Sequence, residues 1–487
     1  MHSRTSAMLF GVVILTVGLL PFASAQTPAR QQAAAGGGAG AYDLQRSIRI
    51  ERYNVAAPSG AARGEVLYYY KCWMCHNQHT KSAPPLKDLY QRPRLLSGEP
   101  VNDTTVANQI KNGSPRMPSF APNLSDTDLA DLLSYLRSGT CCLEGENPPA
   151  NPWYRASTAK WTMDLGERSK LSGGPRGVVR ATNGERPEGV GVQLVAPSAV
   201  RMTVYTNEQG RYEFPQLPAG SYTLRIARPL EYRAYQRNAV PIQGASQLED
   251  IVLEPISGVD LLPAEPEVYG QLSGAEWLWN LAGTAQEKAT FHRACGSGCH
   301  SFQQVFRNRH DERSWRLIVE RMFHYGGAVL INRNRGPSGR GTPEAEEMLV
   351  KWLARVRGPE SPQSKDPPVL TFPRPRRRAS RVVITEYELP RVLLSTHDVA
   401  GDSKGNIWYT SHKSSRVGSL DPRTGIVTEY QVPLTAGAMP GTHRVAVDKN
   451  DIVWWSENWA HNLVRLDPGT GRFTVMPIET STPINSP

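Results

Sequence analysis

The sequence lacks any apolar stretch long enough to span a membrane. A spanning helix needs about 20 apolar residues, whereas the longest run, Met8–Leu20, has 13. Cysteine is scarce, with six residues among 487, and no nucleic-acid-binding motif accompanies the formal net charge of +10. These absences argue against an integral membrane protein and against a nucleic-acid-binding protein.

Apolar residues, glycine and proline are plentiful. The hydrophobic content of 39% is enough to bury several cores, and it excludes a wholly disordered chain. Glycine (42) and proline (39) favour turn-rich β structure and linkers over one long helical bundle. At roughly 150 residues per domain, the length predicts three or four domains.

The N-terminus predicts export. Arg4 precedes the apolar run, and Ala23-Ser24-Ala25 has the small-x-small pattern of a signal-peptidase site. We therefore expect a signal peptide over residues 1–25, cut after Ala25, with an uncleaved anchor as the alternative. The Gln/Ala/Gly-rich residues 26–44 are expected to be a flexible linker. The mature protein would then lie in the periplasm or be secreted.

Cys72, Cys75 and His76 form the C-x-x-C-H pattern, which is typical of covalent c-type haem attachment. Two thiols one helical turn apart reach two vinyl groups of one porphyrin, and the next residue then points its imidazole at the iron. A zinc pair or a thioredoxin-like pair is the alternative. Predicted export and the adjoining histidine argue against both.

The residues around this motif resemble a class I cytochrome c over about residues 45–140. Gly64 and Tyr68 precede the motif on one helical face, and Met117-Pro118 follows a glycine-containing loop. A capping-box-like start at Ser125 leads into a last helix. The resemblance implies His76 and Met117 as axial haem ligands. It also implies that the carbonyl of Pro84 receives the His76 ring N–H.

The connector that follows, residues 141–170, begins with the adjacent cysteines Cys141 and Cys142. We expect either a strained disulfide between them or no special role, with a metal site as a lesser alternative.

Residues 171–255 alternate in short apolar segments separated by Gly/Pro turns, which predicts a small antiparallel sandwich. The segment TNEQGRYEFPQLPAGSYTLRI resembles the carboxypeptidase regulatory-like domain, a transthyretin-like all-β sandwich. That resemblance implies a spacer or contact surface without catalysis of its own.

A second helical domain is expected over residues 270–358. Cys295, Cys299 and His300 form C-x-x-x-C-H, one residue longer than the usual attachment site. Phe291 lies four residues before Cys295, as Tyr68 does before the first motif. This frame resembles a degenerate cytochrome c domain and implies a second haem c. A Cys295–Cys299 disulfide or a Cys/Cys/His metal site are the alternatives.

The distal ligand of this second site is open. No Met-Pro loop follows the motif. Met322, in a helical pattern, is favoured, and His324 would instead give a bis-histidine site of lower potential. A five-coordinate iron open to a small ligand is the third possibility.

Positive charge is concentrated in residues 305–381, where basic residues exceed acidic ones by nine. The densest part is the Pro/Arg-rich linker 359–381, which contains Arg374 and Arg376–Arg378. Two interpretations stay open: a solvated linker, and a docking surface that attracts an acidic redox partner.

Residues 382–487 repeat with a period of 46, so that His397 pairs with His443 and Trp408 with Trp454. This period predicts β-propeller blades, and the units resemble the virginiamycin B lyase (streptogramin lyase) propeller. Two blades cannot close a ring, so we expect either a longer protein or completion by another chain. The resemblance implies elimination chemistry with a His–Glu pair and magnesium, for which His443 and Glu457 are the candidates.

Together these features predict a multidomain fold of all-α cytochrome c domains, an all-β transthyretin-like sandwich and a partial β-propeller. The leading hypothesis is an exported dihaem c-type cytochrome that transfers electrons, rather than an enzyme. One alternative is a haem-linked dehydrogenase that oxidises a small substrate at the propeller. The others are an extracytoplasmic carbohydrate- or cell-wall-binding protein and a streptogramin-type lyase. No catalytic residue is assigned.

Overall fold

The computed structural model of the chain describes residues 59–76, 83–142, 149–151, 154–156, 171–255, 272–295, 302–306, 308–324, 342–361, 370–391, 396–411, 414–435, 438, 441–457 and 459–478. The predicted signal peptide and linker, and the predicted haem residues Cys299 and His300, lie outside these residues. So does the side chain of His324.

The described residues of the first helical domain form four α-helices and two short 3-10 helices. These are α2 (Gly60–Lys71), α3 (Trp73–His76), η2 (Leu89–Gln91), α4 (Asp103–Asn112), η3 (Ala121–Asn123) and α5 (Asp126–Arg137). Both α4 and α5 begin with a capping box, made by Asn102 with Thr105 and by Ser125 with Asp128. Adjacent to α5, Cys141 and Cys142 form a disulfide with each other.

Helices α2 and α5 cross at Gly64. A Cβ at this position would lie 2.1 Å from the backbone oxygen of Asp131 and 2.7 Å from the Cβ of Tyr135. Only glycine therefore lets the two helices approach this closely. The rings of Tyr68 and Tyr135 then pack across the helix pair, with centroids 5.6 Å apart.

The sandwich consists of two sheets over one apolar core. Its strands are β1 (Gly173–Ala181), β2 (Gly191–Val195), β3 (Arg201–Tyr205), β4 (Arg211–Pro215), β5 (Gly220–Ile226), β6 (Gln236–Ile242) and β7 (Ile251–Leu253). The strand orders are β4-β1-β7 and β6-β5-β2-β3-β8. The last strand, β8 (Ile384–Glu386), falls in the segment predicted to be propeller, yet it pairs antiparallel with β3. The first blade strand among the described residues, β9, begins at Thr396.

In the described part of the second helical domain, five helices surround a core rich in aromatic residues. They are α7 (Gly274–Asn280), α8 (Ala285–Cys295), α9 (Phe302–Phe306), α10 (Glu312–His324) and α11 (Pro343–Val356). Phe291 of α8 packs on Trp352 of α11 with ring centroids 5.5 Å apart. This contact repeats the Tyr68–Tyr135 contact of the first helical domain.

The described part of the Pro/Arg-rich linker lies against other domains. The backbone of Leu370 and Phe372 bonds to Asn280 and Glu276 of α7. Arg374 then forms an ion pair with Glu231 at 2.7 Å. The chain continues through the 3-10 helix η5 (Arg377–Arg381) into β8. The segment therefore connects the second helical domain to the sandwich through specific contacts.

Two four-stranded antiparallel sheets form the blades. One has the order β12-β11-β10-β9, and the other β13-β14-β15-β16. Their bounds are β9 (Thr396–Gly401), β10 (Ile407–Ser411), β11 (Arg416–Asp421), β12 (Ile426–Gln431), β13 (Thr442–Val447), β14 (Val453–Glu457), β15 (Asn462–Asp467) and β16 (Arg472–Pro477). The first strands, β9 and β13, lie next to each other, and one apolar core joins the sheets.

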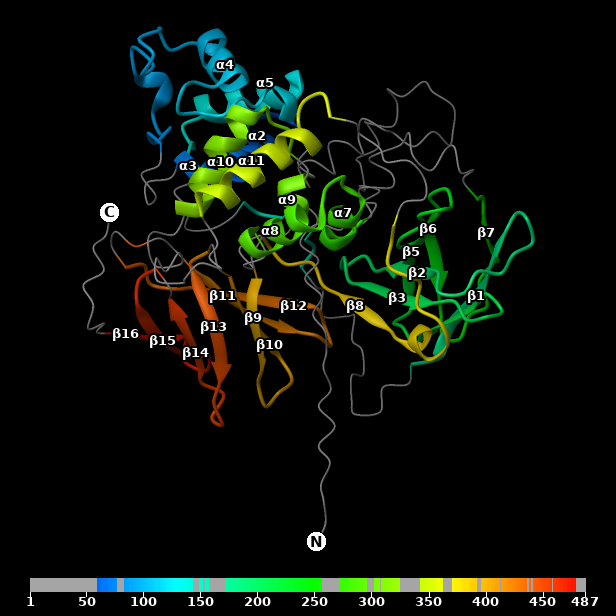
Figure 1. Cartoon of the computed structure of the whole chain (residues 1–487). Helices are drawn as coiled ribbons and strands as arrows, with labels where there is room; N and C mark the ends of the chain where they lie inside the picture. Colours follow the sequence, from blue (N-terminus) through cyan, green and yellow to red (C-terminus); the bar gives the residue numbers. More distant parts are fainter. Residues whose placement is uncertain are drawn as a thin grey trace.

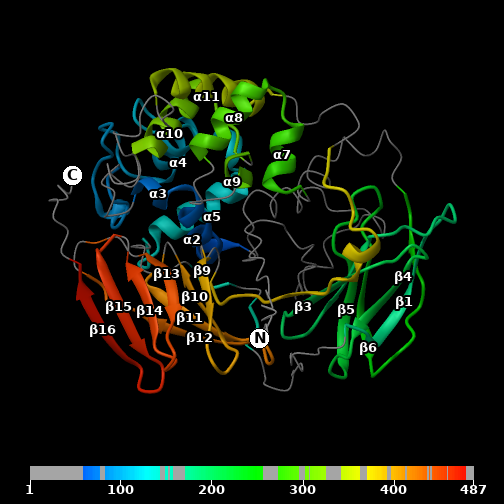
Figure 2. The same cartoon turned by 60° about the horizontal axis from the view of Figure 1, so that its bottom comes forward.

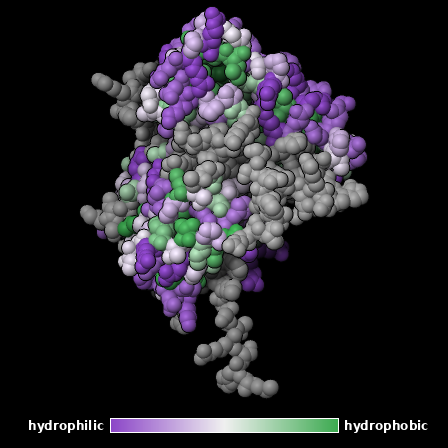
Figure 3. Space-filling view, turned by 90° about the vertical axis from the view of Figure 1, so that its left-hand side faces the viewer, coloured by the Kyte–Doolittle hydropathy of each residue, from purple (hydrophilic) through white to green (hydrophobic). Residues whose placement is uncertain are grey.

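The two helical domains form one cluster above the blades, and the sandwich lies to one side (Figure 1). The same arrangement is seen from another direction in Figure 2. On the face shown in Figure 3, hydrophilic residues dominate the upper part, and hydrophobic ones form scattered small patches among the described residues. None of the helices described here has the length and apolar character that crossing a membrane requires.

Candidate functional site

The C-x-x-C-H residues lie on a single helical turn at the end of α2. The amides of Cys75 and His76 both donate to the carbonyl of Cys72, at 3.1 and 2.9 Å. The Tyr68 hydroxyl donates to the carbonyl of His76 at 3.2 Å and holds this turn against α2. Local helical geometry therefore sets the relative positions of the two thiols and the imidazole.

The ring of His76 is oriented by the loop that follows. Its Nδ1 lies 2.7 Å from the carbonyl oxygen of Pro84, which can only accept, so Nδ1 carries the proton and Nε2 is left as the donor atom for a metal. Burial lowers the pKa of His76, and the nearby Arg321 charge acts in the same direction. The imidazole is thus held neutral, which is the ligating form.

Met117 is presented by a tight loop after α4. The amide and carbonyl of Ser114 bond to the carbonyl and amide of Met117 at 2.9 and 3.1 Å. Gly113 has a φ of 72°, and a Cβ there would lie 2.3 Å from the Met117 oxygen, so the loop requires glycine. The Gln109 amide approaches the Met117 sulfur at 3.8 Å.

A cavity of about 160 Å³ brings these side chains together. Its wall from the first helical domain includes Cys72, Cys75, His76 and Met117, which are the four residues predicted for the first haem site. Two thiols, a neutral imidazole and a thioether around one partly apolar cavity fit the attachment and axial ligation of haem c.

The two thiols of the motif have raised pKa values. Burial raises the pKa of Cys72 to about 12 and also raises that of Cys75, where Arg321 opposes the effect. Within the described ranges, no three His, Cys, Asp or Glu side chains come together as a metal-binding group.

The rest of the cavity wall comes from the second helical domain, which the sequence reasoning did not anticipate. Its contribution consists of Val305, Asn308, His310, Trp315, Ile318, Arg321 and Met322. Met322 was predicted as distal ligand of the second site, but its side chain lines the first site. The one sequence signal for this wall was the excess of positive charge in residues 305–381, to which Arg321 belongs.

The second predicted site is described only in part. Cys295 ends α8 and packs at the edge of the aromatic core. The position of Phe291 relative to Cys295, and its contact with Trp352, match those of Tyr68 in the first helical domain. The ring contact between α8 and α11 therefore resembles the one between α2 and α5. A second attachment site at Cys295, Cys299 and His300 stays a prediction.

Comparisons with known proteins agree with the first site. The family model "Cytochrome C oxidase, cbb3-type, subunit III" matches residues 59–136. Cytochrome c6 of Cyanidium caldarium is 33% identical over 85 residues, which are 18% of this chain and 76% of the relative. The chain belongs to the cytochrome c family. Cytochrome c6 of Synechocystis is 31% identical over 83 residues, covering 17% of this chain and 68% of the relative.

The β domains have relatives of their own. The carboxypeptidase regulatory-like domain matches residues 176–254, which confirms the predicted sandwich. A virginiamycin B lyase from Staphylococcus aureus is similar to 20% of this chain, at 21% identity and a TM-score of 0.18, and the match covers 32% of that lyase. A streptogramin B lyase is similar to 18% of the chain, at 28% identity and a TM-score of 0.16, over 27% of its length. Scores this low establish no common fold. The assignment of propeller blades therefore depends on the sequence repeat of 46 residues and on the two four-stranded sheets.

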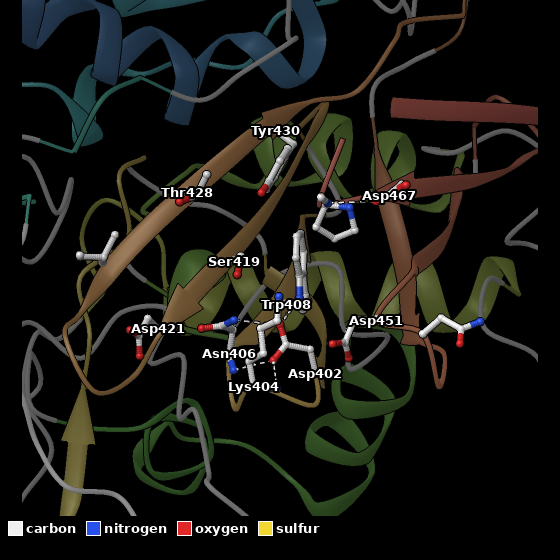
Figure 4. A pocket seen from close by; sticks show the side chains of 14 residues that line it. Asp402, Lys404, Asn406, Trp408, Ser419, Asp421, Thr428, Tyr430, Asp451 and Asp467 are labelled. Carbon is white, nitrogen blue, oxygen red and sulfur yellow. Dashed lines mark hydrogen bonds between the residues drawn. The ribbon is translucent and has the colours of Figure 1, made fainter. Parts of the chain in front are cut away.

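A second cavity, of about 400 Å³, lies along β10, β11 and β12 of the first blade, and turns of the second blade line its other side (Figure 4). In its wall, Asp402 accepts hydrogen bonds from the amides of Lys404 and Asn406 and from the indole of Trp408. In the other blade the amide of Gly469 bonds to Asp467 at 2.9 Å. These carboxylates stabilise turns, which accounts for them without a ligand.

The residues considered for lyase chemistry lie at the junction of the blades. The rings of His397 and His443 are 3.7 Å apart, and burial lowers the pKa of His443. Burial raises the pKa of Glu457, which accepts a hydrogen bond from Asn462 at 2.8 Å. Glu457 is thus engaged within its own blade, and both residues are explained by packing.

Proposed function

We propose that this protein is an exported, dihaem c-type cytochrome that transfers electrons. One observation carries the proposal. Cys72, Cys75, His76 and Met117, which lie up to 45 residues apart in the sequence, line one cavity in a domain of the cytochrome c family. A haem bound there would supply reversible one-electron chemistry.

Each residue of the first site has a distinct role in this proposal. Cys72 and Cys75 would attach the haem through thioethers, and His76 would bind the iron through Nε2. Pro84 keeps the imidazole in the required tautomer. Met117 would be the second protein ligand of the iron, and a thioether ligand favours the reduced iron.

The second haem is proposed at Cys295, Cys299 and His300. The contact between Phe291 and Trp352 supports this assignment, because Phe291 lies four residues before Cys295, as Tyr68 lies four residues before Cys72 and contacts Tyr135. The close packing of the two helical domains supports electron transfer between the two sites.

An outside redox partner is part of the proposal. The exposed Arg376, Arg377 and Arg378 support docking of an acidic protein. Other arginines of the basic zone are already paired within the chain, as Arg316 is with Glu347 at 2.5 Å.

For the propeller we propose binding of a partner or ligand. Oxidation of a small substrate there, carbohydrate binding and lyase activity are the alternatives, and no observation favours them.

Covalent haem stoichiometry tests the proposal. The exported full-length protein is analysed by intact mass and haemochrome absorbance, next to a Cys72→Ser/Cys75→Ser variant and a Cys295→Ser/Cys299→Ser variant. We expect two haems in the wild-type protein and one in each variant.

The outcomes separate the two sites. One haem in the wild type that is lost only with Cys72 and Cys75 would reduce the protein to a single-haem cytochrome. A wild-type protein without covalent haem, prepared with an active haem-attachment system, would overturn the proposed function. Reduction of the haems by a small substrate alone would favour the dehydrogenase alternative.

A further inference from the structure

Helix α10 of the second helical domain closes the first cavity beside Cys75. The guanidinium of Arg321 lies 3.7 Å from the Cys75 sulfur and donates a second hydrogen bond to the carbonyl of Arg116. Arg321 thus joins the two ends of the first site, the attachment turn and the methionine loop. Figures 1 and 2 both show α10 beside α3.

Reciprocal polar contacts hold α10 in this position. Asn123 donates to the carbonyl of Arg309 and accepts from its amide, both at 2.8 Å. The amide of Ser119 donates to the hydroxyl of Ser314 at 3.0 Å. Asn123 is 2% exposed, so these bonds lie inside the interface and are shielded from competing water. The start of α10 is therefore anchored to the segment that follows Met117.

A fixed positive charge at this place has an electrostatic consequence. Reduction of a haem iron lowers the positive charge of the group by one, so a nearby cation favours the reduced form. Helix α10 acts in the same direction by covering the site, because excluding water disfavours the more highly charged oxidised form of the haem.

We propose that the positive charge of Arg321, in the second helical domain, raises the reduction potential of the haem held by Cys72, Cys75 and His76. In this role α10 acts as a built-in cover for the edge of the first site at Cys75. The inference rests on the proposed haem attachment at the first site and needs no second haem.

Potentiometric titration of the haem-loaded, full-length protein tests this inference. In Arg321→Gln, at a fixed ambient potential, we expect the ratio of oxidised to reduced first haem to rise roughly tenfold, because the variant removes one positive charge next to Cys75. Arg321→Lys keeps the charge and should stay close to the wild type. Arg316→Gln is the matched control, because Arg316 of the same helix pairs with Glu312 and Glu347.

A second variant tests the cover without changing Arg321. Asn123→Ala removes both bonds to Arg309, and we expect the oxidised fraction to rise here also. Unchanged potentials in Arg321→Gln and Asn123→Ala, with covalent haem intact, would overturn the inference. So would an equal shift in Arg321→Lys and Arg321→Gln, because the charge would then not be responsible. Absence of haem at Cys72 and Cys75 in the wild type would instead refute the proposed function.

Discussion

At the scale of single residues, a buried ionic cluster stands out in the first helical domain. Arg63 donates to both Asp128 and Asp131, and Asp131 also accepts from the amide of Gly60 at 2.7 Å. The side chains of Arg63 and Asp128 are 5% and 1% exposed. Buried charges persist only when paired, so this cluster fixes how α2 lies on α5.

Arg63→Met should destabilise the protein strongly. It leaves two carboxylates buried without their cation, which costs about 3–5 kcal/mol of unfolding free energy. Chemical denaturation of the haem-loaded protein measures the effect. Arg137→Met is the control: its pair with Asp103 is 48% and 46% exposed, so the expected loss is about 1 kcal/mol or less. Equal losses in the two variants would contradict this account.

At the scale of elements, the two blades repeat one turn in detail. Asp402 accepts from the indole of Trp408 at 3.1 Å, and Asp448 accepts from the indole of Trp454 at the same distance. Each aspartate also accepts from backbone amides two and four residues further along the chain. The turn connects the first two strands of a blade, which explains why Asp and Trp recur with the period of 46.

Asp402→Ala and Asp448→Ala should therefore have equivalent effects. Each leaves several donors without their acceptor, so we expect both variants to unfold at a lower temperature than the wild type. Thermal unfolding followed by tryptophan fluorescence measures this temperature. Lys449→Ala, at an exposed position next to Asp448, should change stability by less than about 0.5 kcal/mol. A marked difference between the two aspartate variants would argue against a shared structural role.

At the scale of the whole molecule, His310 lies at the junction of the two helical domains. It is 2% exposed, and its Nδ1 lies 2.9 Å from the carbonyl oxygen of Ser119. Burial lowers its pKa to about 4, and the positive charge of Lys71 acts in the same direction. The Ser119 carbonyl and Asp311 oppose the shift. The domains therefore pack around a neutral imidazole.

This packing predicts a loss of stability in mild acid. The unfolded chain binds a proton at His310 near pH 6.5, whereas the folded chain resists protonation down to about pH 4. The contribution of neutral His310 to the free energy of unfolding is fully present above about pH 6.5 and is lost as the pH falls towards 4. Between pH 7 and pH 5 the free energy of unfolding should decrease by about 2 kcal/mol. Denaturation of the wild type and His310→Gln at both pH values isolates it. A pH dependence that is equally steep in the variant would contradict the assignment.

The sequence by itself determined the features that depend on neighbours along the chain. The spacing of Cys72, Cys75 and His76 already places them on one helical turn, and a glycine-containing loop presents Met117. The Asp402 turn and the blade repeat are local in the same sense. Hydrogen bonds between near neighbours in the chain require particular residue types at fixed spacing. These local features can therefore be recognised from the sequence before the tertiary structure is known.

Only the tertiary structure decided which parts meet. Arg321 and Cys75 are 246 residues apart, and Asn123 and Arg309 are 186 apart. Likewise, β8 joins the sandwich rather than the blades that follow it. The single sequence carries no spacing rule for such pairs, because their contacts arise from the shapes and charges of surfaces that exist only after each domain has folded. That is why Met322 was predicted for one site and lies in the wall of the other.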